Sequence, residues 1–132
     1  FKKQTSKDHT TGLSTSWNNG IIYCSEITAS LLVLKFGIPS SLIRTIGLNC
    51  STPIFLDEES TETCHLTFID ATHCPGSVMV ILQGYFGTIL HTGDFRFHDS
   101  VLENSLIRNL TFDMVYLDNT YCHPKFDFPS KV

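Results

Sequence analysis

Residues 77 to 92 read SVMVILQGYFGTILHT, and this stretch decides the fold. Residues 77 to 83 form a nearly continuous apolar run, which is typical of a buried strand. Gly84 and Gly87 bracket Tyr85 and Phe86, and TILHT follows as a second strand-like run. A two-residue turn between such runs predicts a β-hairpin.

Further strands are expected on both sides of the hairpin. HLTFIDA, residues 65 to 71, alternates well enough for a strand, and FDMVYLD, residues 112 to 118, is an apolar run of the buried type. Nearer the start, IIYCS, residues 21 to 25, predicts a short strand. The chain therefore combines a helical first section with a strand-rich second section.

The helical section is predicted from its end signals. Ser25 is a suitable N-cap for a helix that ends at Gly37. One face of this helix carries Ile27, Leu31 and Leu34. After Pro39, the segment SSLIRTIG predicts a second short helix.

The composition is that of one globular domain. The chain has 132 residues, 42% of them hydrophobic, with ten phenylalanines that can build a core. Its net charge of −4 argues against a strongly basic nucleic-acid module. The net charge does not exclude a nuclease, because a metal site and a local groove can hold phosphate without overall positive charge.

Cysteine usage and hydropathy limit the cellular environments that are expected for the chain. The five cysteines are odd in number and include no C-x-x-C pair, so reduced thiols are expected rather than a disulfide framework or a zinc knuckle. No apolar run is long enough for a membrane span, and no secretory signal opens the chain. A start at Phe1 rather than Met predicts a fragment or a processed piece.

Three of the predicted strands end in residues that can carry chemistry. His73 lies in DATHCPGS, Asp94 in HTGDFR and Asp118 in YLDNTYC. Open sheets gather functional groups at strand ends, and converging imidazoles and carboxylates suit a hydrolytic metal centre. Thr120, two residues after Asp118, has a hydroxyl that can bind a phosphate oxygen.

Each of these residues also has a plainer interpretation. A single histidine such as His73 is often structural, and the neighbouring Cys74 is expected to be a buried thiol. The carboxylate of Asp94 can be a turn residue, and Asp118 can form an Asx-turn. The pattern alone leaves both interpretations open.

A further ligand-type pair, Asp8 and His9, lies in the polar segment QTSKDHTTG, residues 4 to 12. Aspartate and histidine are common ligands of one metal ion, and a loop that leads into a helix can direct both toward it. The alternative is a helix cap beside a surface histidine.

Four motifs in combination carry a family resemblance: HCPGSVM, GYFGTIL, TGDFRF and LDNTYC. With them the chain resembles the metallo-β-lactamase nucleases of the β-CASP group, in their DNA cross-link repair branch, over most of residues 1 to 122. The resemblance implies an α/β fold, with about the N-terminal half of an αββα sandwich and helices flanking a mixed sheet. Residues 1–132 would then be a partial metallo-β-lactamase domain, with the β-CASP insert and the C-terminal part absent.

The resemblance also implies an activity. Members of this branch are metal-dependent 5′-to-3′ DNA exonucleases of the nucleus, acting in interstrand cross-link repair, double-strand break end processing or telomere end maintenance. DNA would be the partner and Zn²⁺ the cofactor, with two ions in the family. Carried over by motif, the metal ligands are Asp8, His9, His73 and Asp94, the catalytic residues Asp8, Asp94 and Asp118, and the phosphate-binding residues Asp118 and Thr120.

The chain departs from the family at its first metal motif. That motif has the form H-x-H-x-D-H, and here Gln4 and Ser6 stand where its first two histidines belong. The departure predicts weak metal binding and a catalytically impaired chain. An active nuclease and a non-catalytic fragment or interaction module, with an unidentified protein partner, are the alternatives. A thioester-cleaving hydrolase is disfavoured, because TGDFRF with LDNTYC resembles the nuclease branch.

Overall fold

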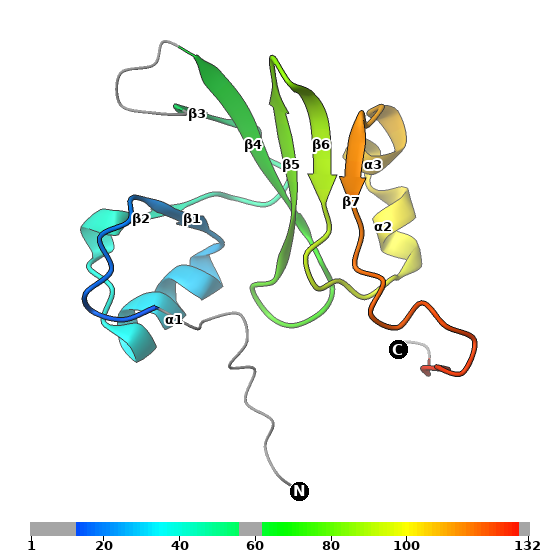
Figure 1. Cartoon of the computed structure of the whole chain (residues 1–132), viewed down its shortest axis with the longest axis horizontal. Helices are drawn as coiled ribbons and strands as arrows, with labels where there is room; N and C mark the ends of the chain where they lie inside the picture. The colour runs from blue at the N-terminus through cyan, green and yellow to red at the C-terminus, as the bar shows by residue number, and fades with distance from the viewer. Residues whose placement is uncertain (1–12, 56–61, 130–132) are drawn as a thin grey trace, which may run out of the picture. The chain divides into compact units, whose positions relative to one another are not determined.

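The computed structural model describes residues 13–55 and 62–129. The chain divides into two compact units, Phe1–Thr45 and Ile46–Val132, each with its own elements (Figure 1). Within the described ranges, no helix combines the length and the apolar character needed to cross a membrane.

The first unit is a strand, a helix and a second strand. Its elements are β1 (Ile22–Cys24), α1 (Glu26–Phe36), the 3₁₀ turn η1 (Ser40–Leu42) and β2 (Ile43–Thr45). The two strands pair in parallel, which requires a crossover such as α1 between them. The Ser25 side chain caps α1 by accepting from the Thr28 amide at 3.3 Å, and Gly37 ends it in the left-handed region. The predicted strand and helix are confirmed.

The apolar face named from the sequence is not the face that α1 buries. Ile27 and Leu31 are about half exposed, and Leu34 is 84% exposed. The helix packs instead through Leu32, which is buried with Cys24, Ile38 and Ile43, together with the partly buried Ala29 and Phe36.

The prediction of a second short helix over residues 40 to 47 is wrong. Only Ser40–Leu42 turn, and Ile43–Thr45 form β2. Pairing with β1 satisfies the backbone of this segment and buries the Ile43 side chain, and the β-branched Ile43 and Thr45 suit a strand.

The second unit is a five-stranded mixed sheet. Its strands, in spatial order, are β3 (Thr52–Phe55), β4 (Thr63–Asp70), β5 (Val78–Gly84), β6 (Gly87–His91) and β7 (Met114–Tyr116). Neighbours are antiparallel except β6 and β7, which are parallel. The predicted hairpin is confirmed, since Gly84 pairs with Gly87. Gly87 has φ +95°, and an added Cβ would collide with the Asp113 carboxylate.

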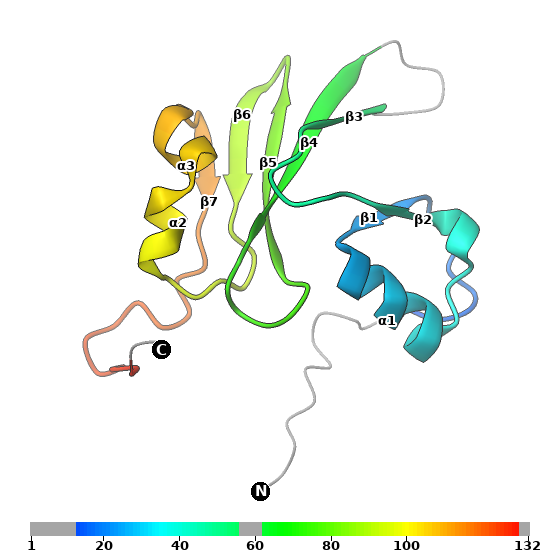
Figure 2. The ribbon, with the colours of Figure 1, turned by 180° about the vertical axis from the view of Figure 1, so that it is seen from behind.

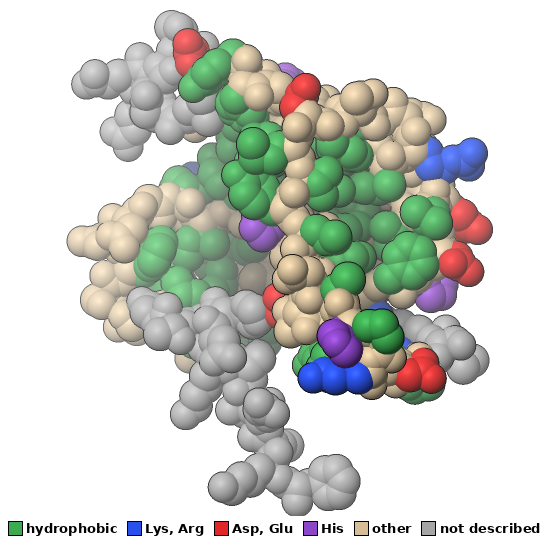
Figure 3. Space-filling view, turned by 45° about the vertical axis from the view of Figure 1, so that its right-hand side comes forward, with side chains coloured by type: hydrophobic (Ala, Val, Ile, Leu, Met, Phe, Trp, Pro, Cys, Tyr) green, Lys and Arg blue, Asp and Glu red, His purple; other side chains and the backbone are tan. Residues whose placement is uncertain are grey.

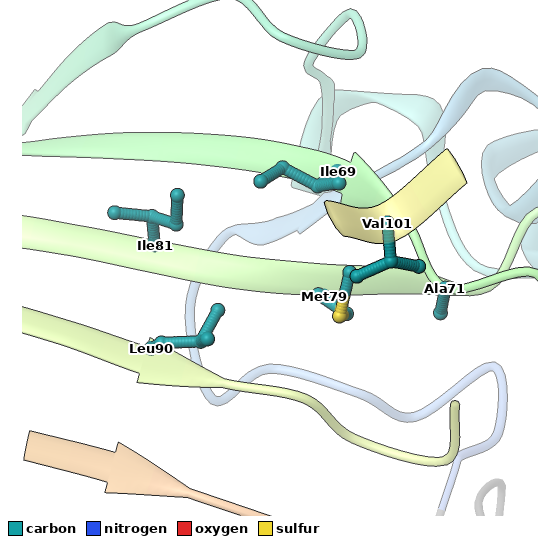
Figure 4. Close-up of a cluster of buried hydrophobic side chains, with 6 residues drawn as sticks. All are labelled: Ile69, Ala71, Met79, Ile81, Leu90 and Val101. Atoms are coloured by element: carbon teal, nitrogen blue, oxygen red, sulfur yellow. The ribbon is translucent and has the colours of Figure 1, made fainter. Parts of the chain in front are cut away.

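Two short helices cover one face of this sheet. They are α2 (Asp99–Glu103) and α3 (Ser105–Asn109), which lie in front of the sheet near β7 in Figure 2. Val101 of α2 packs with Ile69, Ala71, Met79, Ile81 and Leu90 of the sheet region (Figure 4). Neither helix was predicted from the sequence, because five residues are too few to display a helical period.

The other face of the sheet and one of its edges are less covered. Ile46, Leu66 and Phe68 are buried there, whereas Val78, Val80 and Leu82 are only partly buried. At the β7 edge, Met114, Val115 and Tyr116 are each about half exposed. Figure 3 shows hydrophobic side chains gathered over much of the surface seen in that view.

The sheet core gives a test of stability. Ile81 is 0% exposed, so Ile81→Ala should lower the free energy of unfolding by about 2–5 kcal/mol through lost burial and a residual cavity. Leu34→Ala, at a side chain 84% exposed, should change it by less than about 1 kcal/mol. Urea denaturation followed by circular dichroism measures both, and equal losses would contradict this assignment of the core.

Candidate functional site

Three loops leave the second unit's sheet at the same end. Strands β4, β6 and β7 run in the same direction, because β4 and β6 are both antiparallel to β5 and β7 is parallel to β6. The loops that follow these strands carry His73, Asp94 and Asp118 in turn. The topology therefore brings together the three strand ends that the sequence singled out.

The loop after β4 is a tight turn with a strained residue. Thr72 has φ +52°, a left-handed conformation that is unusual for a β-branched residue. Its amide donates to Asp70 Oδ1 at 2.8 Å, and its hydroxyl donates to the Arg96 carbonyl. His73, the next residue, presents an exposed side chain.

The same turn corrects the expectation for Cys74. Its side chain is exposed rather than buried. The Ser77 hydroxyl accepts from the Cys74 amide at 3.1 Å and donates to the Cys74 carbonyl at 2.7 Å. These bonds close the turn through its backbone, so the thiol remains at the surface.

The loop after β6 carries Asp94. Gly93 has φ +53°, and its amide donates to His91 Nδ1 at 3.0 Å. The Asp94 side chain is exposed. Farther along, the Arg96 amide donates to the Ala71 carbonyl at 3.0 Å, so this loop is bonded to the His73 loop through both its amide and its carbonyl groups.

The loop after β7 places Asp118 in an Asx-turn, which confirms the plainer interpretation of its geometry. The amide and the hydroxyl of Thr120 donate to Asp118 Oδ1 at 3.0 and 2.6 Å. These bonds are the main cause that lowers the pKa of Asp118; burial opposes them by raising it, and the nearby His73 and the Phe95 amide lower it by smaller amounts. Asp118 is therefore held ionised, while Thr120 already uses its hydroxyl proton on that carboxylate.

Only two of the four metal ligands inferred from the resemblance, His73 and Asp94, lie among the described residues. Asp8 and His9, with Gln4 and Ser6, lie outside the described residues. Among the residues that are described, no group of three His, Cys, Asp or Glu side chains could hold a metal ion. Zinc sites use three or four protein ligands, so His73 and Asp94 alone do not fit one.

Two threonines that join these loops were not predicted from the sequence. Thr72 and Thr92 hydroxyls form bonds to residues 24 and 26 positions away in the chain. No local pattern reveals such bonds. The one available signal was that each threonine lies directly before a singled-out segment, His73 or Gly93–Asp94.

Comparison with curated proteins identifies relatives, although no protein-family model matches the chain. The 5′ exonuclease Apollo of Danio rerio is 44% identical over 132 residues, which are 99% of this chain and 23% of the relative. Apollo of Mus musculus is 48% identical over 125 residues, 94% of this chain and 23% of the relative. The DNA cross-link repair protein SNM1 of Arabidopsis thaliana is 40% identical over 126 residues, 94% of this chain and 24% of the relative.

The chain thus spans about a quarter of the length of these relatives, and the similarity extends over nearly all of it. It includes the three loops at the end of the sheet as well as the strands that carry them. The resemblance found in the motifs is confirmed: over nearly its whole length, this chain is similar to Apollo and SNM1 proteins, which are members of the metallo-β-lactamase and β-CASP group.

Proposed function

We propose that this chain carries part of a metal-dependent 5′-to-3′ DNA exonuclease of cross-link repair, and that its own cleavage activity is impaired. The observation that carries the proposal is the gathering of His73, Asp94 and Asp118 at one end of the sheet, on loops bonded to each other. The names of the relatives, exonuclease and DNA cross-link repair protein, support DNA as the substrate.

The proposal extends to the fold and to the cellular setting. A five-stranded mixed sheet with helices on one face is compatible with part of an αββα metallo-β-lactamase sandwich, and residues 1–132 would form a partial domain of that kind. A repair nuclease acts in the nucleus. Interstrand cross-links, double-strand break ends and telomere ends are the substrates that the family resemblance suggests.

Zinc is the metal we propose, with Asp8, His9, His73 and Asp94 as its ligands. Imidazole nitrogen and carboxylate oxygen are both ligands that zinc accepts. The impairment follows from Gln4 and Ser6, since a neutral amide and a hydroxyl replace two imidazoles of the family motif. Even changes outside the ligand set lower metal affinity or activity about 10- to 100-fold, so the loss of two ligands should lower them further.

A non-catalytic interaction module is the second candidate, and one observation favours it. The outer face of α1 is apolar and exposed, with Leu34 84% and Leu31 50% exposed. A hollow of about 480 Å³ lies beside it, lined by residues of α1, η1 and β2. A module of this kind would be insensitive to Asp94→Asn but sensitive to Leu34→Asp in assays of partner binding.

The metal assignment predicts a difference between two matched variants. The unaltered chain should hold substoichiometric zinc after dialysis, and Asp94→Asn should hold less because a ligand oxygen is lost. Asp99→Asn makes the same change at an exposed residue of α2 and should match the unaltered chain. Metal analysis by mass spectrometry measures all three. Two tightly held zinc ions in the unaltered chain would show the impairment to be wrong, and equal zinc in Asp94→Asn would remove Asp94 as a ligand.

Restoring the family motif should restore cleavage. In the double variant Gln4→His and Ser6→His, hydrolysis of 5′-phosphorylated DNA should rise by at least about tenfold, because the missing imidazoles return. Gln4→Ala with Ser6→Ala is the control and should stay at the level of the unaltered chain. Adding Asp94→Asn to the restored chain should abolish the gain. If the double variant shows no activity, that result would count against the proposal that this site derives from a nuclease metal site.

The ionised state of Asp118 gives a pH prediction. A carboxyl whose pKa is lowered by folding adds stability above its unfolded pKa, and that stability is lost as the pH falls through the folded-state pKa. Thr120→Val removes the hydroxyl bond and should raise the pKa of Asp118 toward its ordinary value. Carbon NMR titration of the carboxyl measures this, with Thr111→Val as a control. An unchanged pKa would mean that the hydroxyl bond is absent in solution.

A further inference from the structure

Thr92 is a buried polar residue at the end of β6, with its side chain between two of the site loops. It is 3% exposed and directly precedes Gly93 and Asp94. Its hydroxyl donates to the Gly93 carbonyl at 3.0 Å and accepts from the Asp118 amide at 2.9 Å. Its own amide donates to the Tyr116 carbonyl at 3.0 Å.

One oxygen atom therefore bridges two acidic segments that are distant in the chain. On one side it bonds the peptide group that immediately precedes Asp94, and on the other it bonds the backbone of Asp118. The bonds that Thr120 makes to Asp118 stay within that loop, so they shape the loop without fixing its position. The Thr92 hydroxyl supplies a connection from this loop to the sheet.

We infer that Thr92 is a positioning residue, which fixes the Asp118–Thr120 turn relative to the Gly93–Asp94 turn so that both acids face one DNA end. The inference rests on the proposed function, because the spacing of the two turns matters only if they act on one substrate. The ligand class it concerns is the 5′-phosphorylated end of a DNA strand.

The chemistry of the side chain explains why a hydroxyl is needed. Valine has nearly the same shape as threonine but can neither donate nor accept a hydrogen bond. In Thr92→Val the Asp118 amide and the Gly93 carbonyl would lose their partner at a partly buried position, which is unfavourable. The Asp118 loop would then move to find water. Serine keeps the hydroxyl, so Thr92→Ser should keep the loop in place.

Two readouts test this role. In Thr92→Val, hydrogen exchange of the Asp118 amide should accelerate by about tenfold, because its acceptor is gone. Affinity for a 5′-phosphorylated single strand of about 12 nucleotides, measured by fluorescence anisotropy, should fall by a similar factor. Thr92→Ser should restore both values. The same strand with a 5′-hydroxyl should bind equally to all variants.

Thr67→Val is the matched control. Thr67 is also 3% exposed, and it lies within β4 rather than at the loop end of the sheet. This variant should change neither readout. A purely structural role for Thr92 would leave the affinity of Thr92→Val for the 5′-phosphorylated strand as unchanged as that of Thr67→Val, and that result would overturn the inference.

The outcomes separate this inference from the proposed function. If the unaltered chain does not distinguish the 5′-phosphate from the 5′-hydroxyl, the proposed function fails and the positioning role fails with it. If the unaltered chain does distinguish them and Thr92→Val binds as tightly, only the positioning role is overturned. If Thr92→Val shows faster exchange of the Asp118 amide and loses the preference for a 5′-phosphate, and Thr92→Ser restores both, the proposed function and the positioning role are both supported.

Discussion

The parallel pairing of β7 with β6 is the constraint on which the second unit depends. Parallel neighbours need a crossover, and here the crossover is made by α2 and α3, which also cover one face of the sheet. The same pairing directs the chain after β7 to the end where the loops after β4 and β6 emerge. One backbone arrangement thus completes a core and aligns three loops.

Much of the sheet could be predicted from the sequence, because turn glycines and apolar runs are patterns within a few neighbouring residues. Gly84 and Gly87 mark the hairpin whatever surrounds them, and apolar runs mark β4 to β6 within one or two residues. The prediction of a helix over residues 40 to 47 was wrong for the opposite reason. Their strand structure depends on the parallel pairing of Ile43 with Ile22, which lies in a segment before α1. Helices α2 and α3 were not predicted because they are short and begin at the N-caps His98 and Asn104.

The candidate site divides in the same way. His73, Asp94 and Asp118 could be found because each follows a recognisable strand and occurs in a distinctive motif. The hydroxyl bonds of Thr72 and Thr92 could not, since they join loops that only the folded sheet brings together. Asp8 and His9, which are proposed as metal ligands from the motif, lie outside the described residues.

The exposed edge of β7 has a consequence for handling the protein. Its three residues are apolar and about half exposed, and Leu117 directly after them is 60% exposed. Edge strands with apolar side chains are templates for pairing with other extended chains, which leads to aggregation. Preparations of this chain should therefore lose material increasingly as they are concentrated. Conditions that shield apolar edges, such as mild detergent, should improve recovery more than added salt.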